Sequence, residues 1–535
     1  MKTPPSTMFA RALGLLALTL ATTGHAATPT APTAPAASCA ALAKLALPDV
    51  TITLAQPVAA GQAPAPQGEG AFLGKFSGMG VAGLTRPARN PAFCRVAGSI
   101  RPSADSDIKF EVWLPQKGWN GKFMAAGNFG WGGALMLAAM PDALSQGYAV
   151  ASTDTGHDSG TDDGKGGRFA LGHPEKLIDY AYRADHLMTV HAKAIIKAFY
   201  GHGPKYSYWV GCSLGGLEGL VEAQRYPEDY DGIVVGAPPN TLVNFNAAQL
   251  WPGWLVRQNP ALNMTKAKFE MVSKAVLQAC AGPVGRQQGF VDAPEQCGFE
   301  PRQLLCKGEE TADCLTAGQV QLMEQIYRGP VNPRTGEVIF PGPAKGSEAE
   351  LFVFAGDKPF ANALDLFRYA AFEDVNWDGT QIDWDRDIAQ ASAKVGALFS
   401  VDANLQPFFA RGGKLLLYIG WNDYHNPAEL VDYYHALRRN GGQDGVRLFT
   451  LPGVGHCFGG AGCDTFDKLG AIDDWVSARK PPLRLTASKV VNGRIARTRP
   501  ICAYQAVAKY KGSGDINDAS SFICAAAEEK GNTGS

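Results

Sequence analysis

The segment Gly211-Cys212-Ser213-Leu214-Gly215 constrains the fold of this chain more than any other feature. It follows an apolar run at 206–210 and precedes a helix-like stretch from 214 to about 225. A serine between two glycines at a strand-to-helix corner is typical of a nucleophile elbow, because the glycines permit a turn sharp enough to push the hydroxyl clear of the sheet. The bare pattern recurs by chance in a chain with 62 glycines, so its position between strand and helix is what predicts a catalytic serine.

Apolar runs elsewhere in the chain predict further strands of the same sheet. Before the serine, apolar residues recur at steps of three and four from Tyr180 to Ala198, which indicates a helix with one buried face. Strands that are apolar throughout and alternate with helices favour an α/β fold with a parallel sheet covered on both faces. The runs lie at 108–114, 122–126, 148–153, 206–210, 232–235, 414–419 and 446–451.

The alternation of strands and helices stops at about residue 241 and resumes at about residue 410. The stretch between holds four of the 11 cysteines, many prolines and glycines, and an aromatic-rich portion at 352–384. We therefore expect one α/β domain in two parts, 38–240 and 411–535, interrupted by a large inserted lid domain at 241–410.

The N-terminus has the pattern of an export signal. Lys2 and Arg11 supply positive charge, residues 12–21 form an apolar core too short for a permanent membrane span, and small residues flank His25. We expect removal of residues 1–26, followed by a disordered Ala/Thr/Pro-rich leader at 27–37. The mature chain is then secreted or periplasmic, where its cysteines can form disulfides.

Charge and ligand patterns exclude several kinds of partner. The formal net charge is −1 and there is no long basic block, which argues against nucleic acid and anionic membranes. His186 and His191 lie five apart on one predicted helix, so they do not face one metal ion cleanly. We expect a small-molecule partner, no metal and no cofactor.

A serine hydroxyl is a poor nucleophile until a base takes its proton, and that base needs an acid to orient it. In α/β-hydrolases these partners follow in the order serine, acid, histidine, each on a loop after a strand. Asp423 follows the run at 414–419, and His456 follows the run at 446–451 through a glycine-containing loop. The rival acids Asp402, Asp432 and Asp444 and the rival bases His425 and His435 fit this order less well.

Two cysteines flank this predicted triad. Cys212 immediately precedes Ser213, and Cys457 immediately follows His456. If the serine and the histidine meet, their neighbours must also lie close together. A Cys212–Cys457 disulfide would then hold the two catalytic loops together.

The Cys212-Ser213 pair, the distant Asp423 and the His456-Cys457 pair resemble the signature of the tannases and feruloyl esterases. That family also contains the mono(hydroxyethyl) terephthalate hydrolases. The resemblance continues at 230–234, 236–238, 496–500 and 510–515 and covers nearly the whole mature chain. It implies an α/β-hydrolase fold with a lid, and ester hydrolysis through an acyl-enzyme formed by Ser213, His456 and Asp423.

The resemblance also implies an oxyanion hole and a set of disulfides. The oxyanion donors would be the backbone amides of Leu214 and of the loop at 125–130, for which we choose Gly127. Cys463 is left unpaired, and only the Cys212–Cys457 pair has an argument independent of the resemblance. The other implied pairs are Cys39–Cys94, Cys280–Cys297, Cys306–Cys314 and Cys502–Cys524.

Relatives carry an acidic calcium-binding loop between the cysteines that correspond to Cys280 and Cys297. Calcium needs several oxygen ligands converging from one loop. Here the expected aspartates are replaced by Ala281, Val284 and Gln288, and Asp292 remains alone. We therefore predict that this chain has lost the calcium site.

The resemblance points to feruloyl, other hydroxycinnamoyl or galloyl esters as substrates. A terephthalate monoester is the alternative within the family, a non-catalytic exported aromatic-binding protein is the alternative outside it, and a metallohydrolase lacks a ligand set. His425, Asn426 and Arg368 are our candidates for substrate contacts. Lid aromatics that could stack on the acyl ring are Phe352, Phe354, Phe360, Phe367, Tyr369, Phe372, Trp377 and Trp384.

Overall fold

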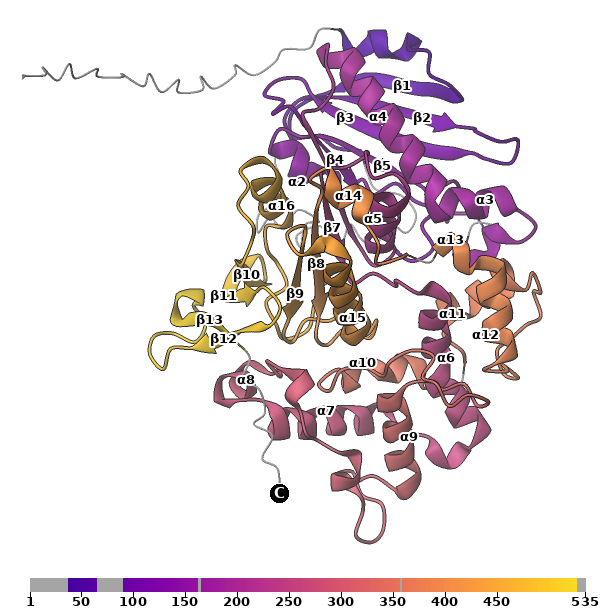
Figure 1. Cartoon of the computed structure of the whole chain (residues 1–535), viewed down its shortest axis with the longest axis vertical. Coiled ribbons are helices and arrows are strands. Elements are labelled where there is room, and N and C mark those ends of the chain that lie inside the picture. The colour runs from indigo at the N-terminus through magenta and orange to yellow at the C-terminus, as the bar shows by residue number, and fades with distance from the viewer. Residues whose placement is uncertain (1–36, 65–89, 162–164, 357, 400, 527–535) are drawn as a thin grey trace, which may run out of the picture.

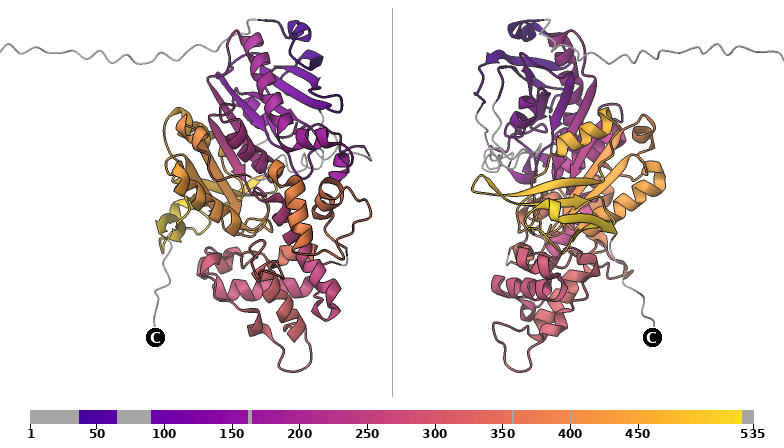
Figure 2. Two further views of the ribbon diagram at one scale, coloured as in Figure 1. Left: turned by 45° about the vertical axis from the view of Figure 1, so that its right-hand side comes forward. Right: turned by 90° about the vertical axis from the view of Figure 1, so that its left-hand side faces the viewer.

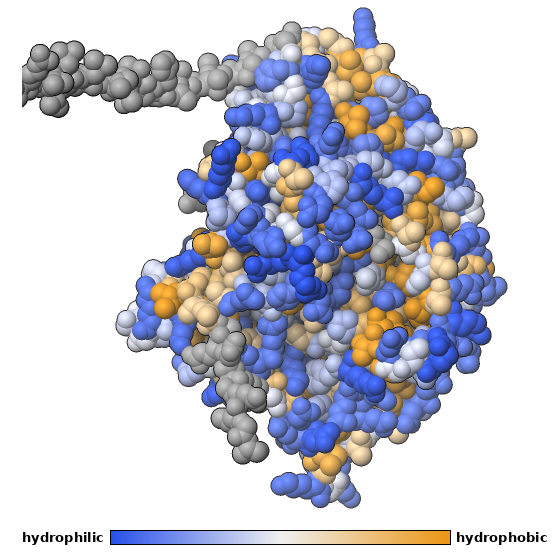
Figure 3. All heavy atoms as spheres, viewed as in Figure 1, coloured by the Kyte–Doolittle hydropathy of each residue, from blue (hydrophilic) through white to orange (hydrophobic). Residues whose placement is uncertain are grey.

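The computed structural model describes residues 37–64, 90–161, 165–356, 358–399 and 401–526. The expected signal peptide at 1–26, and the expected leader at 27–37 except for its last residue, lie outside these residues. Within the described part of the chain, every helix is too short or too polar to cross a membrane. On the face seen in Figure 3, hydrophilic residues cover most of the surface and hydrophobic residues lie in groups between them.

A nine-stranded sheet in the order β1-β2-β3-β5-β4-β6-β7-β8-β9 forms the centre of the upper part of the molecule (Figure 1). The six strands from β5 to β9 in this order are parallel, whereas β1, β2 and β3 run antiparallel to their neighbours. The α/β-hydrolase fold is thus confirmed, with a mixed sheet instead of the expected parallel one. The strands are β1 (Val50–Val58), β2 (Phe93–Ile100), β3 (Ile108–Pro115), β4 (Lys122–Ala126), β5 (Ala149–Thr153), β6 (Tyr206–Cys212), β7 (Gly232–Gly236), β8 (Lys414–Gly420) and β9 (Val446–Leu451).

Helices cover both faces of the sheet. Successive residues of a strand point to opposite sides, so a strand that is apolar throughout has apolar side chains on both faces. On β6, the Trp209 indole donates to the Gly215 carbonyl in α5 at 2.8 Å, and the neighbouring Tyr208 hydroxyl donates to Asp473 on α16 at 2.7 Å. Strand side chains are therefore buried on both faces, as the apolar runs predict. The covering helices include α2 (Met140–Ser145), α4 (Ala184–Tyr200), α5 (Leu214–Arg225), α15 (Pro427–Leu437) and α16 (Lys468–Ser477).

Helix α4 corresponds to the predicted helix, but the predicted buried face is wrong by about one residue. Val190 is 40% exposed, while Asp185 and His191 are buried. A pattern of apolar residues misses this face because polar side chains form part of it.

Between β7 and β8 the chain builds a helical region with its own hydrophobic core (Figures 1 and 2). That core also takes in Trp131, Phe169 and Tyr180 from the first part of the sheet domain, so the two parts pack along a shared aromatic cluster. Near the end of the region, Val401 and Phe408 pack into the main core instead. The helices are α6 (Leu242–Gln258), α7 (Lys266–Cys280), α8 (Pro283–Gln288), α9 (Ala317–Arg328), α10 (Glu348–Leu351), α11 (Ala361–Asp365), α12 (Arg386–Ala391), α13 (Ala397–Phe399) and α14 (Gln406–Ala410).

The C-terminal segment forms two small antiparallel sheets beside β9 (Figure 2). β10 (Arg484–Val491) pairs with β11 (Arg494–Cys502), and β12 (Ala506–Tyr510) pairs with β13 (Phe522–Ala526). The Tyr504 amide donates to the Leu448 carbonyl of β9 at 2.8 Å, which ties these sheets to the strand that leads into the His456 loop.

Candidate active site

Ser213 lies at the turn between β6 and α5 in a backbone conformation that requires its two glycine neighbours. Its φ is +62° and its ψ is −125°, outside the regions that ordinary residues prefer. A Cβ on Gly211 would lie 2.1 Å from the Gly215 carbonyl oxygen, and a Cβ on Gly215 would lie 2.8 Å from the Asn128 carbonyl oxygen. Only glycine fits at either position, so the pattern read from the sequence is a steric requirement of this turn.

The loops after β8 and β9 bring an acid and a histidine together. His456 Nδ1 lies 3.0 Å from Asp423 Oδ2 and 3.1 Å from Oδ1. The Asp423 side chain is fully buried and also accepts the His425 amide at 2.7 Å. Because a carboxylate only accepts hydrogen bonds, Nδ1 carries the proton and Nε2 is left as a base.

Ser213 and His456 line one cavity, although no direct hydrogen bond joins these two described side chains. A disulfide between Cys212 and Cys457, with the Cα atoms 6.0 Å apart, links the residues next to them across a sequence separation of 245. The expected neighbours are therefore joined. The hydrogen bond between a catalytic serine and its histidine is often long or misaligned until substrate binds.

The oxyanion hole predicted from the sequence needs backbone amides that are free to donate, and the Gly127 amide is already hydrogen-bonded. The Gly127 amide donates to the Val210 carbonyl at 3.1 Å, and the Asn128 amide donates to Glu218 Oε2 at 2.8 Å. We therefore correct the choice of Gly127. The amides of Leu214 and Phe129 make no hydrogen bond to any described residue, and both residues line the cavity.

The cavity around the serine has a volume of about 710 Å³, and seven of its lining residues are Phe, Tyr or Trp. Of the lid aromatics named from the sequence, Phe360 alone lines it; Phe367 and Trp384 are instead buried in the lid core. The other aromatic residues of the wall were not singled out from the sequence, although Phe129, Tyr424 and Phe458 lie in the same loops as the predicted oxyanion and triad residues. They are Phe129, Trp131, Tyr180, Phe245, Tyr424 and Phe458.

One of the three candidate contact residues lines this cavity. The His425 ring packs against the His456 ring with centroids 3.6 Å apart and the ring planes tilted by 34°, and burial lowers the His425 pKa well below its usual value of 6.5. Asn426 instead caps helix α15 by accepting the Ala428 amide at 3.0 Å, and its side-chain amide donates to the Pro341 carbonyl. Arg368 lies away from the cavity, where its Nε donates to the Trp377 carbonyl at 2.9 Å.

The residues present do not fit the calcium site of the family. Asp292 is the single carboxylate at 281–292, and Arg499 binds it at 2.5 Å. Two other groups of described residues lie close enough to share a metal ion, but each already contains a histidine–aspartate hydrogen bond. These groups are Asp423 with His425 and His456, and His186 with Glu222 and Asp229.

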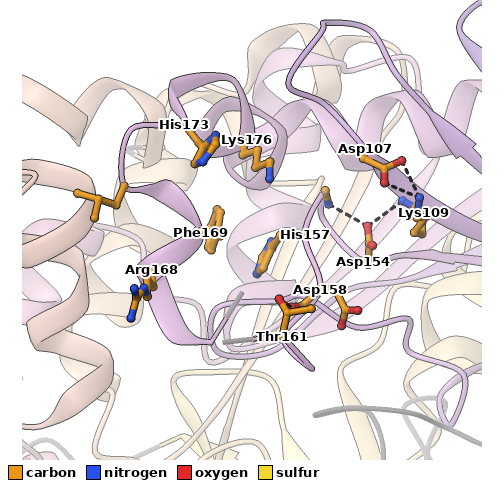
Figure 4. A pocket seen from close by; sticks show the side chains of 12 residues that line it. Asp107, Lys109, Asp154, His157, Asp158, Thr161, Arg168, Phe169, His173 and Lys176 are labelled. Atoms are coloured by element: carbon orange, nitrogen blue, oxygen red, sulfur yellow. Dashed lines mark hydrogen bonds and ion pairs between the residues drawn. The ribbon is translucent and has the colours of Figure 1, made fainter. Parts of the chain in front are cut away.

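A second pocket of about 490 Å³ is lined by Phe169, whose ring also packs against Trp131 and Tyr180 in the aromatic cluster (Figure 4). The His157 ring stacks on Phe169 with centroids 3.6 Å apart, and Asp154 accepts the amides of Lys109 and Gly156, each at 2.9 Å. Burial raises the Asp154 pKa to about 8. Acidic and basic side chains are mixed in this pocket, and none of the described residues that line it also lines the serine cavity.

The remaining cysteines form the pairs that the resemblance implies. Disulfides join Cys39–Cys94, Cys280–Cys297, Cys306–Cys314 and Cys502–Cys524. Cys463 is buried and has no disulfide partner.

Comparison with known proteins shows that the chain is similar to esterases in both sequence and structure. A family model described as tannase and feruloyl esterase matches residues 94–525. An uncharacterised esterase of Xanthomonas campestris pv. campestris is 34% identical, with 90% of each chain covered. The mono(2-hydroxyethyl) terephthalate hydrolase of Piscinibacter sakaiensis is 31% identical, with 82% of this chain and 85% of that one covered. The crystal structure of feruloyl esterase B from Aspergillus oryzae has a TM-score of 0.80 at 26% identity and covers 91% of this chain and 99% of its own.

Proposed function

The chain belongs to the tannase and feruloyl esterase family, and from this membership we propose that it hydrolyses esters of aromatic acids through an acyl-enzyme on Ser213. Carboxylic ester hydrolysis is the activity of the family. The observation that carries the assignment to these residues is the His456–Asp423 pair, which lines the same cavity as a serine on a strained elbow.

In the proposed reaction, Ser213 Oγ attacks the ester carbonyl while His456 Nε2 accepts its proton. Asp423 holds the imidazole in the tautomer with Nδ1 protonated and stabilises the imidazolium. The carbonyl oxygen becomes an oxyanion held by the Leu214 and Phe129 amides. His456 then protonates the leaving alcohol, and a water activated by the same base releases the acid.

We assign the acyl group to the feruloyl, hydroxycinnamoyl or galloyl class. The aromatic wall suits a planar ring. No lysine or arginine is among the described residues of the wall, and its one carboxylate belongs to Glu350. A terephthalate monoester carries a free carboxylate, which would find no cationic partner there.

The disulfides support a location outside the cytoplasm. The structure holds five of them, and such bonds persist in oxidising compartments. Together with the signal pattern at 1–26, they support our proposal that the chain is secreted or periplasmic.

A substrate panel tests the proposed function. We expect the wild type to cleave methyl ferulate or methyl gallate with a higher kcat/KM than mono(2-hydroxyethyl) terephthalate. Ser213→Ala should abolish turnover, whereas Ser145→Ala, at an exposed serine, should leave it unchanged. Preference for the terephthalate ester would contradict the substrate class, and activity retained in Ser213→Ala would contradict the mechanism.

A further inference from the structure

Helix α6 places one of its faces in the wall of the serine cavity. Leu242, Phe245, Asn246 and Gln249 all line it, at the spacing of a single helical face. The Phe245 ring contacts the His425 ring with centroids 4.4 Å apart, and the His425 ring packs against the His456 ring. Only the His425 side chain therefore separates this face of α6 from His456.

Gln249 is a largely buried residue on this face, 4% exposed, whose amide makes no hydrogen bond to a described residue. The neighbouring Asn246 differs, because its Nδ2 donates to the Leu242 carbonyl at 2.7 Å. Because Gln249 lines the cavity, its amide is open to water or to a ligand bound there.

The position of Gln249 along the helix matches the far end of an aromatic acyl group. It lies one turn beyond Phe245, which is about 6 Å further along the helix axis. An ester carbonyl held at Ser213 would place its ring between the aromatic walls and its ring substituents toward this amide. The amide can both donate and accept, so it suits a neutral hydroxyl better than a carboxylate.

We infer that Gln249 is a specificity-determining residue that hydrogen-bonds a phenolic hydroxyl on the acyl ring of the substrate. The inference rests on the proposed function and adds to it the residue of this chain that recognises the ring hydroxyl of the acid. A site built to bind a substrate hydroxyl discriminates against the analogue that lacks it, because the buried amide is then left unpaired.

The test compares methyl 4-hydroxycinnamate with methyl cinnamate, which differ only in the ring hydroxyl. For Gln249→Leu we expect kcat/KM on the hydroxylated ester to fall about 10- to 100-fold, while kcat/KM on methyl cinnamate stays equal or rises. Gln249→Met, with a side chain of similar length, should give the same pattern and serves if the leucine variant folds poorly. Gln258→Leu, at an exposed site on the same helix, is the matched control and should change neither rate.

An equal fall on both esters, or an unchanged ratio between them, would overturn the inference while leaving the proposed function intact. A wild type that cleaves neither of these two esters, nor methyl ferulate, nor methyl gallate would instead refute the proposed function, and the inference with it.

Discussion

Removal of the Cys212–Cys457 disulfide should damage catalysis as well as stability. The bond closes a loop across a sequence separation of 245, for which the chain-entropy relation gives about 5.5 kcal/mol of stabilisation. It also fixes the serine turn against the histidine loop, and a misplacement of about 1 Å between reacting groups can cost about 100-fold in rate. For Cys212→Ala/Cys457→Ala we therefore expect kcat to fall about 10- to 100-fold, with a smaller change in KM.

The matched control is Cys39→Ala/Cys94→Ala. That bond spans a separation of 55, joins the N-terminal segment to β2, and is worth about 4 kcal/mol by the same relation. Urea unfolding followed by circular dichroism measures stability, and initial rates on methyl ferulate give kcat and KM. Both double variants should lose stability, but only the first should lose kcat. If the first variant kept kcat within twofold of the wild type, the disulfide would have no role in positioning the triad.

Three further predictions follow from individual contacts. Asp423→Asn should lower kcat about 10⁴-fold, because the amide favours the wrong tautomer of His456, and initial-rate kinetics would contradict this with a loss below tenfold. Burial raises the Asp154 pKa from 3.8 to about 8. Between pH 3.8 and pH 8 the folded state therefore holds a proton on Asp154 that the unfolded state has lost. The free energy of unfolding then falls by up to about 1.4 kcal/mol for each unit by which the pH rises. The urea midpoint of Asp154→Asn should therefore fall less than that of the wild type from pH 5 to pH 8, and parallel curves would refute this. Calcium should leave the melting temperature unchanged because Arg499 already pairs with Asp292, and a chelator-reversible rise would show that the site binds the ion.

Much of the fold could be predicted because its signals are local. The strands from β3 to β9 are apolar runs, and the glycines at 211 and 215 report a turn that no larger residue fits. Strand β1 alternates half-buried with exposed residues, so a search for apolar runs does not find it. Its antiparallel pairing with β2 depends on contacts between distant segments.

The site was harder to predict where it depends on tertiary hydrogen bonds. Gly127 has the expected loop position, but its amide is used in the sheet by Val210, and the sequence gives no sign of this. The wall residues Phe245 and Gln249 lie on a helix of the inserted region, where no motif marks which face meets the serine. The sequence also does not show that Asn426 caps a helix or that Arg368 donates to a backbone carbonyl, because both contacts form only in the folded loops.

The most direct test of the account is covalent labelling with a fluorophosphonate, followed by peptide mapping. The probe forms a stable bond with a serine only when a base activates it. We predict one adduct, on the peptide that contains Ser213, and its loss in His456→Ala. Labelling at another serine, or labelling of Ser213 that is unaffected by His456→Ala, would contradict the proposed triad.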